Sequence, residues 1–519
     1  MARFSQCLFL ILFFPSWAQA QAPSWFPEVS CGEVDLNVTP RSQCYKNWTI
    51  LIFMAANNDL TPYALWDFME MEASYPMKRA GSTEELDLVV DIQSRLNGDL
   101  RRYHIQQSET PFDINLGIEE FRHRRLDDIQ SPLVVHEPIR SLPLEGQLFD
   151  YLDWAMKNYP AKNKMLVVWG HGQGWGSMGP GNDSTPFAGR FGGLAFQENS
   201  QDFLTVPAIA RVLQKVEEET FESLDKLDVY ASDACLMQMV EVAFEIAPFT
   251  RYIVGSAQVQ SYLGFPYRRM IYETNRGCYN IREKGHLFCD DNLGLPGTRP
   301  ADQPLVFMAN VCGDDLSCYM AQMLPKLTRQ SFHTMGLQGK ASPESYERMT
   351  MSSLVAAEIQ YRLPDEMDQF SKAMLSYLET ATVDQSIEVL KIVKESFEFM
   401  SEGKELGIFL TFLHSFLRDQ GTPQAKNLKK QCESFMNFLD HSVLAYAFGK
   451  IYSENFYEYL GAKAVSIWIP TSEERFHQRI QDFRESRLYQ VLEKDTDGST
   501  FWEKWVLQVL KPKNRPFPE

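Results

Sequence analysis

The chain has 519 residues and carries 50 Lys and Arg against 68 Asp and Glu, so its formal net charge is −18. Hydrophobic residues make up 44% of the chain and charged residues 23%, which is ordinary globular usage and excludes a disordered or fibrous protein. The acidic balance excludes nucleic acid as a main partner, because phosphate binding requires clustered cations, and the length predicts about two to four domains.

The first 20 residues have the features of a secretory signal peptide. Arg3 supplies the positive end, residues 7–14 the apolar run, and residues 18–20 a small-x-small cleavage site. This apolar run is too short to cross a membrane, and no stretch of spanning length follows it. We therefore expect a secreted or periplasmic protein without a membrane span.

Export places the cysteines in an oxidising compartment, where disulfides form. Cys7 is removed with the signal, and six of the others fall into three short-range pairs: Cys31 with Cys44, Cys278 with Cys289, and Cys312 with Cys318. Zinc ligation is the alternative, but no Cys-x-x-Cys or His-x-x-x-His spacing favours it. Cys432 lies on the apolar face of a helical pattern and is expected in the core. Cys235 is the remaining thiol.

Short β-rich runs alternate with amphipathic helices through the first half of the chain, which is typical of a mostly parallel α/β sheet flanked by helices. Strands are expected at residues 48–54, 86–92, 164–169, 227–232 and 252–256, with an edge hairpin at 101–107. Helices are expected at residues 142–158, 206–216 and 236–246. A further helix is expected to be capped by Thr61 and to begin with Pro62.

A segment rich in Gly, Pro and Asp, from about residue 278 to 304, indicates a domain boundary. Helical periodicity dominates from there to about residue 460, an apolar strand follows at 462–470, and residues 473–510 are mainly helical. The predicted domains are a signal peptide at 1–20, an α/β domain at 21–300, a mainly helical region at 301–461, and a C-terminal strand with helices at 462–519.

Two polar motifs follow core strands directly: residues 169–172, Trp-Gly-His-Gly, and residues 233–235, Asp-Ala-Cys. Ligand crevices of open α/β sheets lie at the carboxyl ends of strands, and consecutive strands are usually neighbours. We therefore expect His171 and Cys235 to face one crevice, where the imidazole can act as general base for a nucleophilic thiol. Each motif alone is more typical of a turn or a small core residue, so the prediction depends on their joint placement.

The backbone around this pair suggests how a reaction would be assisted. Gly172 permits close approach of a carbonyl group, and its N–H is a candidate oxyanion donor. We expect Cys235 to open a helix, so that its own N–H is the second donor and the positive helix end favours the thiolate. Asp233 is expected to bind a positively charged side chain of the substrate.

At these motifs the sequence resembles the clostripain family of cysteine endopeptidases, relatives of caspases, legumains and gingipains. The resemblance covers residues 48–60, 169–175, 233–243, 254–256 and 264–267, with weaker likeness at 405–409 and 465–470. It implies a caspase-haemoglobinase fold and a Cys–His dyad that cleaves proteins or peptides after Arg or Lys. His171 would be the base, Cys235 the nucleophile, Gly172 and Cys235 the oxyanion donors, and Asp233 part of the pocket for the basic side chain.

The resemblance also implies activation by self-cleavage between the two motifs. The polar, Gly-rich residues 176–193 contain one basic residue, Arg190, so we expect cleavage after Arg190, with a solvated linker as the alternative. Residues 255–272 contain no acid, and Gln258 stands where relatives often have one, so basic specificity would depend mainly on Asp233.

Some relatives depend on calcium, which needs several oxygen ligands. This sequence requires no cofactor and has no metal motif, and it leaves calcium open. The competing functions are a non-catalytic secreted binding protein on a peptidase scaffold and a cysteine hydrolase or transferase of non-peptide amides.

Overall fold

The protein was analysed as a computed structural model. It describes residues 22–73, 80–94, 99–109, 118–138, 142–175, 192–198, 202–223, 225–284, 312, 315–337, 348–399, 403–449 and 461–511. The predicted signal peptide, Arg190 and Cys289 lie outside these ranges.

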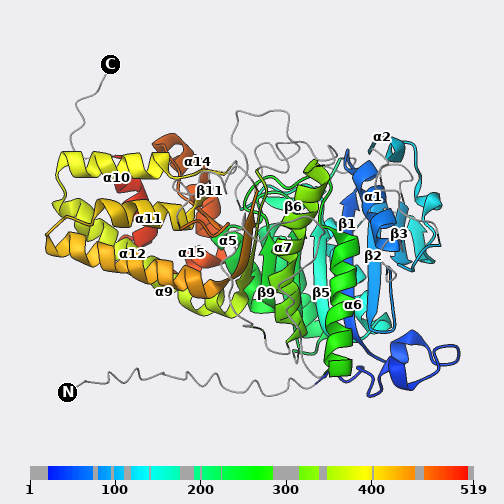
Figure 1. The fold of residues 1–519 in the computed structure, drawn as a ribbon. Helices are drawn as coiled ribbons and strands as arrows, with labels where there is room; N and C mark the ends of the chain where they lie inside the picture. The colour runs from blue at the N-terminus through cyan, green and yellow to red at the C-terminus, as the bar shows by residue number, and fades with distance from the viewer. Residues whose placement is uncertain are drawn as a thin grey trace, which may run out of the picture.

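One large sheet of nine strands dominates the described part of the chain (Figure 1). Its strands are β1 (Lys46–Ala56), β2 (Leu86–Ser94), β3 (Asp99–His104), β4 (Leu133–Pro138), β5 (Ala161–Trp169), β8 (Leu227–Asp233), β9 (Thr250–Gly255), β10 (Thr350–Val355) and β12 (Val443–Phe448). Their order across the sheet is β12-β10-β9-β8-β5-β1-β2-β3-β4. Pairing is parallel from β2 through β1, β5 and β8 to β9, and antiparallel toward both edges. The predicted α/β fold class is confirmed.

Two short sheets of two strands accompany the large one. β6 (Gly193–Gln197) pairs with β7 (Asp202–Thr205), and β11 (Gly403–Glu405) pairs with β13 (Ser466–Trp468). An isolated bridge between Gly172 and Leu194 joins β6 to the loop after β5. Another bridge, between Met239 and Ser466, joins β13 to the segment after β8.

The central strands are buried on both faces, because alternate side chains of a strand point to opposite sides of a sheet. In β1, Leu51 and Phe53 enter the core beneath α3 (Leu144–Asn158), α4 (Val206–Lys215) and α5 (Val240–Ile246). Ile50 and Ile52 enter the opposite core, beneath α1 (Thr61–Glu72), α6 (Tyr267–Lys284) and α7 (Leu316–Leu337). Helices therefore cover both faces, as the near-continuous apolar strands require.

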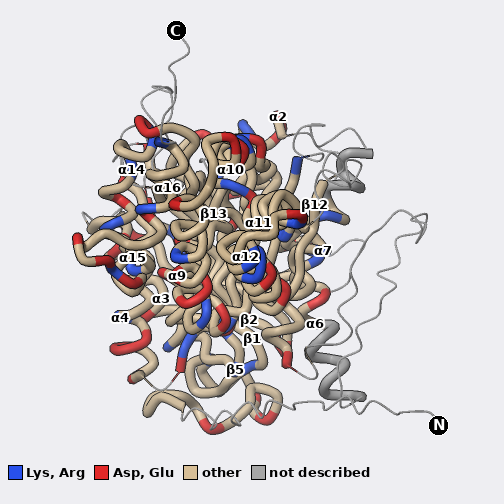
Figure 2. The backbone as a smooth tube through the Cα atoms, turned by 90° about the vertical axis from the view of Figure 1, so that its left-hand side faces the viewer, with Lys and Arg blue, Asp and Glu red and all other residues tan. Residues whose placement is uncertain are grey.

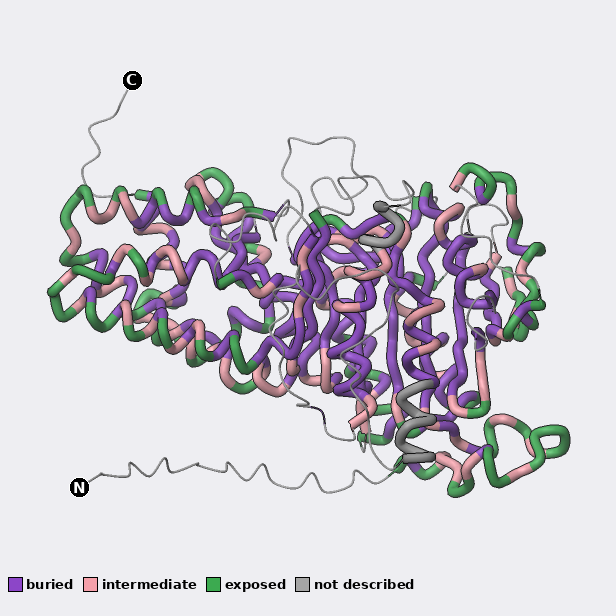
Figure 3. Tube along the Cα trace, viewed as in Figure 1, coloured by how far each residue is buried: buried purple, intermediate pink, exposed green. Residues whose placement is uncertain are grey.

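A bundle of helices extends from the β12 side of the sheet (Figure 1). It consists of α9 (Ala356–Thr380), α10 (Val383–Glu395), α11 (Leu406–Phe416), α12 (Pro423–Ser442), α14 (Glu473–Glu485), α15 (Arg487–Val491) and α16 (Phe501–Leu510). Phe370, Phe409 and Trp505 pack at its centre and continue the core beneath α5. Figure 3 shows this continuous buried interior. Figure 2 shows Lys and Arg interspersed with Asp and Glu over the outer helices.

Short elements complete the described structure: α2 (Ile118–Phe121), the 3-10 turns Cys31–Glu33, Arg41–Gln43, Leu126–Asp128 and Ala247–Phe249, and a π-helical turn at Val216–Thr220. None of the helices in the described ranges combines the length and the apolar character that a membrane crossing requires.

Several predicted elements differ from the structure. The region 301–461, predicted as mainly helical, also supplies β10 and β12 to the large sheet. The proposed domain division itself remains a prediction. Thr61 is the first residue of α1 rather than its cap, and its hydroxyl donates to the carbonyl oxygens of Ala56 (2.6 Å) and Asn58 (2.9 Å).

The cysteines follow the predicted scheme where they are described. Disulfides join Cys31 to Cys44 and Cys312 to Cys318, which confirms two of the three predicted pairs. The third predicted pair is not tested, because Cys289 lies outside the described residues. Cys432 is fully buried in the core, as predicted.

Candidate active site

The two polar motifs meet at the carboxyl edge of the large sheet. Trp169 and Asp233 are the last residues of β5 and β8 and stand opposite each other in the parallel register. Beyond them, the Gly170 N–H donates to the Asp233 carbonyl oxygen at 3.2 Å. A Cβ atom added to Gly172 would lie only 2.4 Å from the carbonyl oxygen of Cys235. The structure thus brings the His171 and Cys235 loops into direct contact.

His171 is held on both its backbone and its side chain. Its carbonyl oxygen accepts a hydrogen bond from the Ala195 N–H (2.9 Å), so β6 fixes the loop. Its Nε2 lies 2.7 Å from Oδ1 of Asp59, whose carboxylate is largely exposed in the turn between β1 and α1. Asn58 shapes that turn by accepting from the Leu60 N–H at 2.9 Å. An imidazole oriented in this way can accept and return a proton.

The sequence predicted no role for Asp59, which lies in the segment 48–60 that resembles the clostripain family. It lies 112 positions before His171, and no local pattern links the two residues. The sequence offered one indication of this contact: Asp59 and His171 follow neighbouring parallel strands, β1 and β5, whose carboxyl ends lie at one edge of the sheet.

The backbone of Gly172 is turned toward Cys235. Gly172 faces Leu194 of β6 in an isolated antiparallel bridge, and the bonds flanking this pair run from Gln173 N–H to the Gly193 carbonyl (3.0 Å) and from Ala195 N–H to the His171 carbonyl. This is the non-hydrogen-bonded type of antiparallel pair, in which the two facing residues exchange no bonds. β6 therefore does not use the N–H of Gly172, which suits a donor to a bound group.

Cys235 lies in a tight turn and is partly exposed. The prediction that it opens a helix is wrong, because α5 begins only at Val240. Leu236 adopts a φ of 62°, and its N–H donates to the Gln258 carbonyl oxygen at 3.1 Å. This pairing with the loop after β9 overrides the helical pattern of residues 236–239.

The surroundings of the Cys235 thiol do not favour the thiolate, contrary to the prediction from the sequence. Burial raises the pKa of the Cys235 thiol to about 11, and the nearby Asp233 charge raises it further, while the Gln260 N–H, 3.2 Å from Sγ, lowers it in part. The expected lowering by a helix end is therefore wrong. Burial of this kind disfavours the thiolate form of Cys235 in the free protein.

Asp233 is buried, and its carboxylate is enclosed by the loop after β9. Oδ1 accepts from the Gln260 side-chain amide (3.0 Å), and Oδ2 accepts from the Phe265 N–H and the Tyr267 hydroxyl (2.8 Å each). Burial raises the pKa of Asp233 to about 6. Gly264, with a φ of 62°, permits this approach, since a Cβ there would lie 2.7 Å from Asp233 Oδ2.

Two acids of α1 lie in the same buried region, and neither was predicted from the sequence. Asp67 is fully buried, and its Oδ2 accepts from Trp169 Nε1 at 2.8 Å. Its Oδ1 has no hydrogen-bond partner among the described residues. Burial and the Asp233 charge raise the pKa of Asp67 well above its usual value, and burial raises that of Glu70 to about 7. The sequence offered one indication of this cluster: Asp67 and Glu70 lie three positions apart, on the apolar face of the predicted helix.

Gln258, which replaces an acid common in relatives, does not reach Asp233 by any described hydrogen bond. Its Oε1 accepts from the Val259 N–H at 3.0 Å, and its side chain is buried. Gln260 is the residue that contacts both Asp233 and the thiol.

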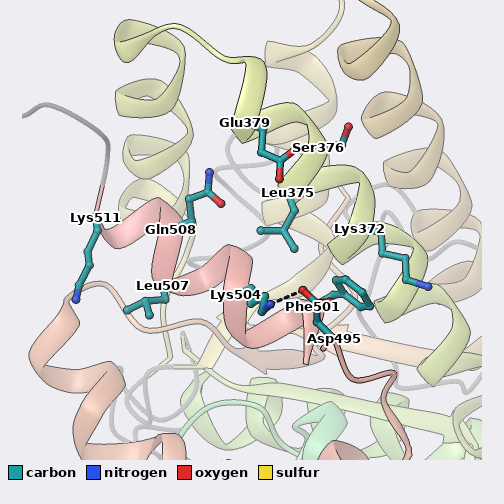
Figure 4. Close-up of a pocket in the computed structure, with 10 residues that line it drawn as sticks. All are labelled: Lys372, Leu375, Ser376, Glu379, Asp495, Phe501, Lys504, Leu507, Gln508 and Lys511. Carbon is teal, nitrogen blue, oxygen red and sulfur yellow. Dashed lines mark hydrogen bonds and ion pairs between the residues drawn. The ribbon is translucent and has the colours of Figure 1, made fainter. Parts of the chain in front are cut away.

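Within the described ranges, no group of three or more His, Cys, Asp or Glu side chains is arranged to hold a metal ion. A groove of about 510 Å³ lies between α9 and α16 in the helical bundle (Figure 4). Three lysines line it, and each is paired with a carboxylate: Lys372 with Glu493, Lys504 with Asp495, and Lys511 with Glu473. None of the site residues lines this groove.

The chain was compared with known protein families, curated proteins and solved structures. The sequence model of the clostripain family matches residues 52–505. No curated protein matched the chain. Among solved structures, the secreted C11 cysteine protease iotapain of Bacteroides thetaiotaomicron is similar with a TM-score of 0.52 and 11% identity, over 86% of this chain and 99% of that one. This similarity indicates a shared fold.

Two further solved structures have lower TM-scores. A complex of a secreted C11 cysteine protease from the same organism with an irreversible peptide inhibitor has a TM-score of 0.49 and 14% identity, over 86% of this chain and 99% of that one. An inactive zymogen C11 protease from Parabacteroides distasonis has a TM-score of 0.46 and 16% identity, over 88% and 100%.

Proposed function

Because this chain belongs to the clostripain family and is a cysteine peptidase, we propose that Cys235 is its nucleophile and His171 its general base. The observation that carries this assignment is the contact between the two motifs, in which Gly172 lies against the backbone of Cys235. Family membership supports the reaction, and this contact supports the choice of His171 and Cys235.

The reaction follows from the groups at this edge of the sheet. The thiol passes its proton to His171 as Sγ bonds to the substrate carbonyl carbon, and the N–H groups of Gly172 and Cys235 stabilise the oxyanion. The C–N bond then breaks, and His171 returns the proton to the leaving amine. Water, deprotonated by His171, hydrolyses the thioester and restores the thiol. Asp59 orients the imidazole.

We further propose that the enzyme is an endopeptidase that cleaves after Arg or Lys. Asp233 directly precedes the Ala234–Cys235 turn, and Asp67 lies beside it with one carboxyl oxygen lacking a partner among the described residues. A guanidinium or ammonium group that enters would favour the ionised form of both acids. Acids from α1 would thus compensate for the missing acids of residues 255–272.

The remaining proposals rest on the sequence. Residues 1–20 direct export, which would make the enzyme secreted or periplasmic, and cleavage after Arg190 in the 176–193 loop activates it. If Arg190→Ala still yields the two fragments of the unaltered protein, the activation site lies elsewhere. No cofactor is proposed, and a chelator tests for calcium.

The decisive experiment measures hydrolysis of Arg, Lys and norleucine amide reporters by the mature protein, with and without chelator. Cys235→Ala and His171→Ala should each lose at least about 10³-fold in kcat/KM. Cys432→Ala removes the other thiol described as free and should retain turnover. Turnover that survives Cys235→Ala would overturn the nucleophile. No turnover by the folded, cleaved protein would favour the binding-protein alternative.

A further inference from the structure

The helical bundle contributes aromatic side chains to the surroundings of Cys235. Phe399 forms a small buried apolar cluster with Leu236 and Ala257, and Phe397 and Cys235 pack against that cluster. The rings of Phe397 and Phe399 meet edge to face, with centroids 5.0 Å apart. Both residues lie between α10 and β11, far along the chain from the two polar motifs.

This aromatic pair is held in place by backbone hydrogen bonds. The Phe399 N–H donates to the Gly403 carbonyl oxygen (2.8 Å), and the Glu405 N–H donates to the Phe397 carbonyl oxygen (2.9 Å). Lys404, fully buried, donates from Nζ to the Glu398 carboxylate at 2.6 Å. Phe397 therefore lies on a segment that hydrogen bonds hold against β11.

β11 is also connected to the segment that carries Cys235. β11 pairs with β13, and the Ser466 N–H of β13 donates to the Gln238 carbonyl oxygen at 3.0 Å. Gln238 Nε2 in turn donates to the Ser352 carbonyl oxygen of β10 at 3.1 Å. The backbone segments that carry Phe397 and Cys235 are thus joined by hydrogen bonds through β13.

The loop that donates to the thiol adds further exposed apolar surface. The Gln260 N–H binds Cys235 Sγ, and its neighbours Val259 and Tyr262 are 39% and 58% exposed. Tyr262 stacks on Tyr63 at 5.2 Å between ring centroids. Large apolar side chains gathered around a reactive group in this way are typical of a ligand-binding surface.

We propose that Phe397 and Val259 form an apolar subsite beside Cys235, which binds a bulky aliphatic or aromatic side chain of the substrate next to the basic residue. This inference rests on the proposed function. It is distinct from the proposed site for the basic side chain, because that site is built from Asp233 and α1 whereas Phe397 lies between α10 and β11. The bundle would therefore help to select substrates.

The test uses internally quenched peptides with one Arg, in which the residue before or after Arg is Leu or Gly. We expect the unaltered enzyme to prefer Leu at one of these positions, and Phe397→Ala to reduce that Leu:Gly ratio of kcat/KM about tenfold. Cleavage of the Gly peptides should change less than about twofold. Phe397→Leu should restore most of the preference.

Phe412→Ala is the matched control, because Phe412 is a partly buried phenylalanine of α11 packed on the main core. It should leave the ratio unchanged. An unchanged Leu:Gly ratio in Phe397→Ala would overturn the inference, because the ring would then not contact the substrate. An equal rise in kcat/KM for all peptides would also overturn it, because the ring would then only restrict access to the thiol.

Failure of the proposed function gives a different result, namely no cleavage of any peptide by the unaltered protein. Binding of the same peptides, labelled with a fluorophore, to Cys235→Ala then still tests the subsite. Tighter binding of the Leu peptide that Phe397→Ala abolishes would support it, and equal binding of the Leu and Gly peptides would overturn it.

Discussion

Replacing Gly172 by alanine tests the contact between the two motifs. The added Cβ would lie 2.4 Å from the Cys235 carbonyl oxygen, 2.8 Å from the Ala234 Cβ and 3.0 Å from the Cys235 nitrogen. Ordinary contact begins near 3.4 Å, so the backbones must separate by about 1 Å. A misplacement of about 1 Å at reacting groups costs about 10²-fold in rate, or about 2.7 kcal/mol.

We therefore expect Gly172→Ala to lower kcat/KM for an arginyl amide reporter about 100-fold. Overpacking costs about 1–3 kcal/mol of stability, so urea unfolding must confirm that the variant is folded under assay conditions. Gly421→Ala is the control, because a Cβ there meets no atom within 4 Å. If Gly172→Ala retains kcat/KM within twofold of the unaltered enzyme, the inferred geometry is wrong.

Three other predictions follow from the charges of the site. Burial raises the pKa of Cys235 to about 11, so its alkylation by iodoacetamide, measured in a Cys432→Ala background, should accelerate about tenfold per pH unit from pH 7 to 10; a plateau below pH 9 would contradict a protonated resting thiol. Asp59→Asn should lower kcat/KM about two- to fivefold, as for an exposed ion pair, without changing the urea midpoint; no loss of activity would mean that Asp59 does not orient His171. Burial raises the pKa of Asp67, and an acid with a higher pKa in the folded state loses folding free energy as pH rises above its unfolded pKa. Asp67→Asn should therefore gain urea resistance relative to the unaltered protein at pH 8 but much less at pH 5, and a pH-independent difference would contradict this assignment.

The strands that position the two motifs could be predicted from the sequence. The strands that end at Trp169 and Asp233 contain short apolar runs, at residues 165–169 and 229–231, and their β-branched and aromatic residues are typical of buried parallel strands. Because such strands end at one edge of the sheet, the proximity of His171 and Cys235 could be predicted without coordinates.

What the sequence missed depends on contacts between distant segments. Residues 236–239 have a helical pattern, but hydrogen bonds to the loop after β9 and the positive φ of Leu236 delay α5 to Val240. β10 and β12 are short and follow long helical patterns, so only their pairing with β9 and with each other defines them as strands. Phe397 could not be linked to Cys235 from the sequence, because its position depends on hydrogen bonds to β11 and on the pairing of β11 with β13.

The most direct test of the account is to map the residue that reacts with a substrate-like electrophile. The mature protein is incubated with a peptidyl arginine acyloxymethyl ketone and digested, and the modified residue is identified by mass spectrometry. We expect a single adduct on the Cys235 sulfur, slowed at least about 10²-fold in His171→Ala. An adduct on another residue, or full labelling of Cys235 at an unchanged rate in His171→Ala, would contradict the proposed dyad.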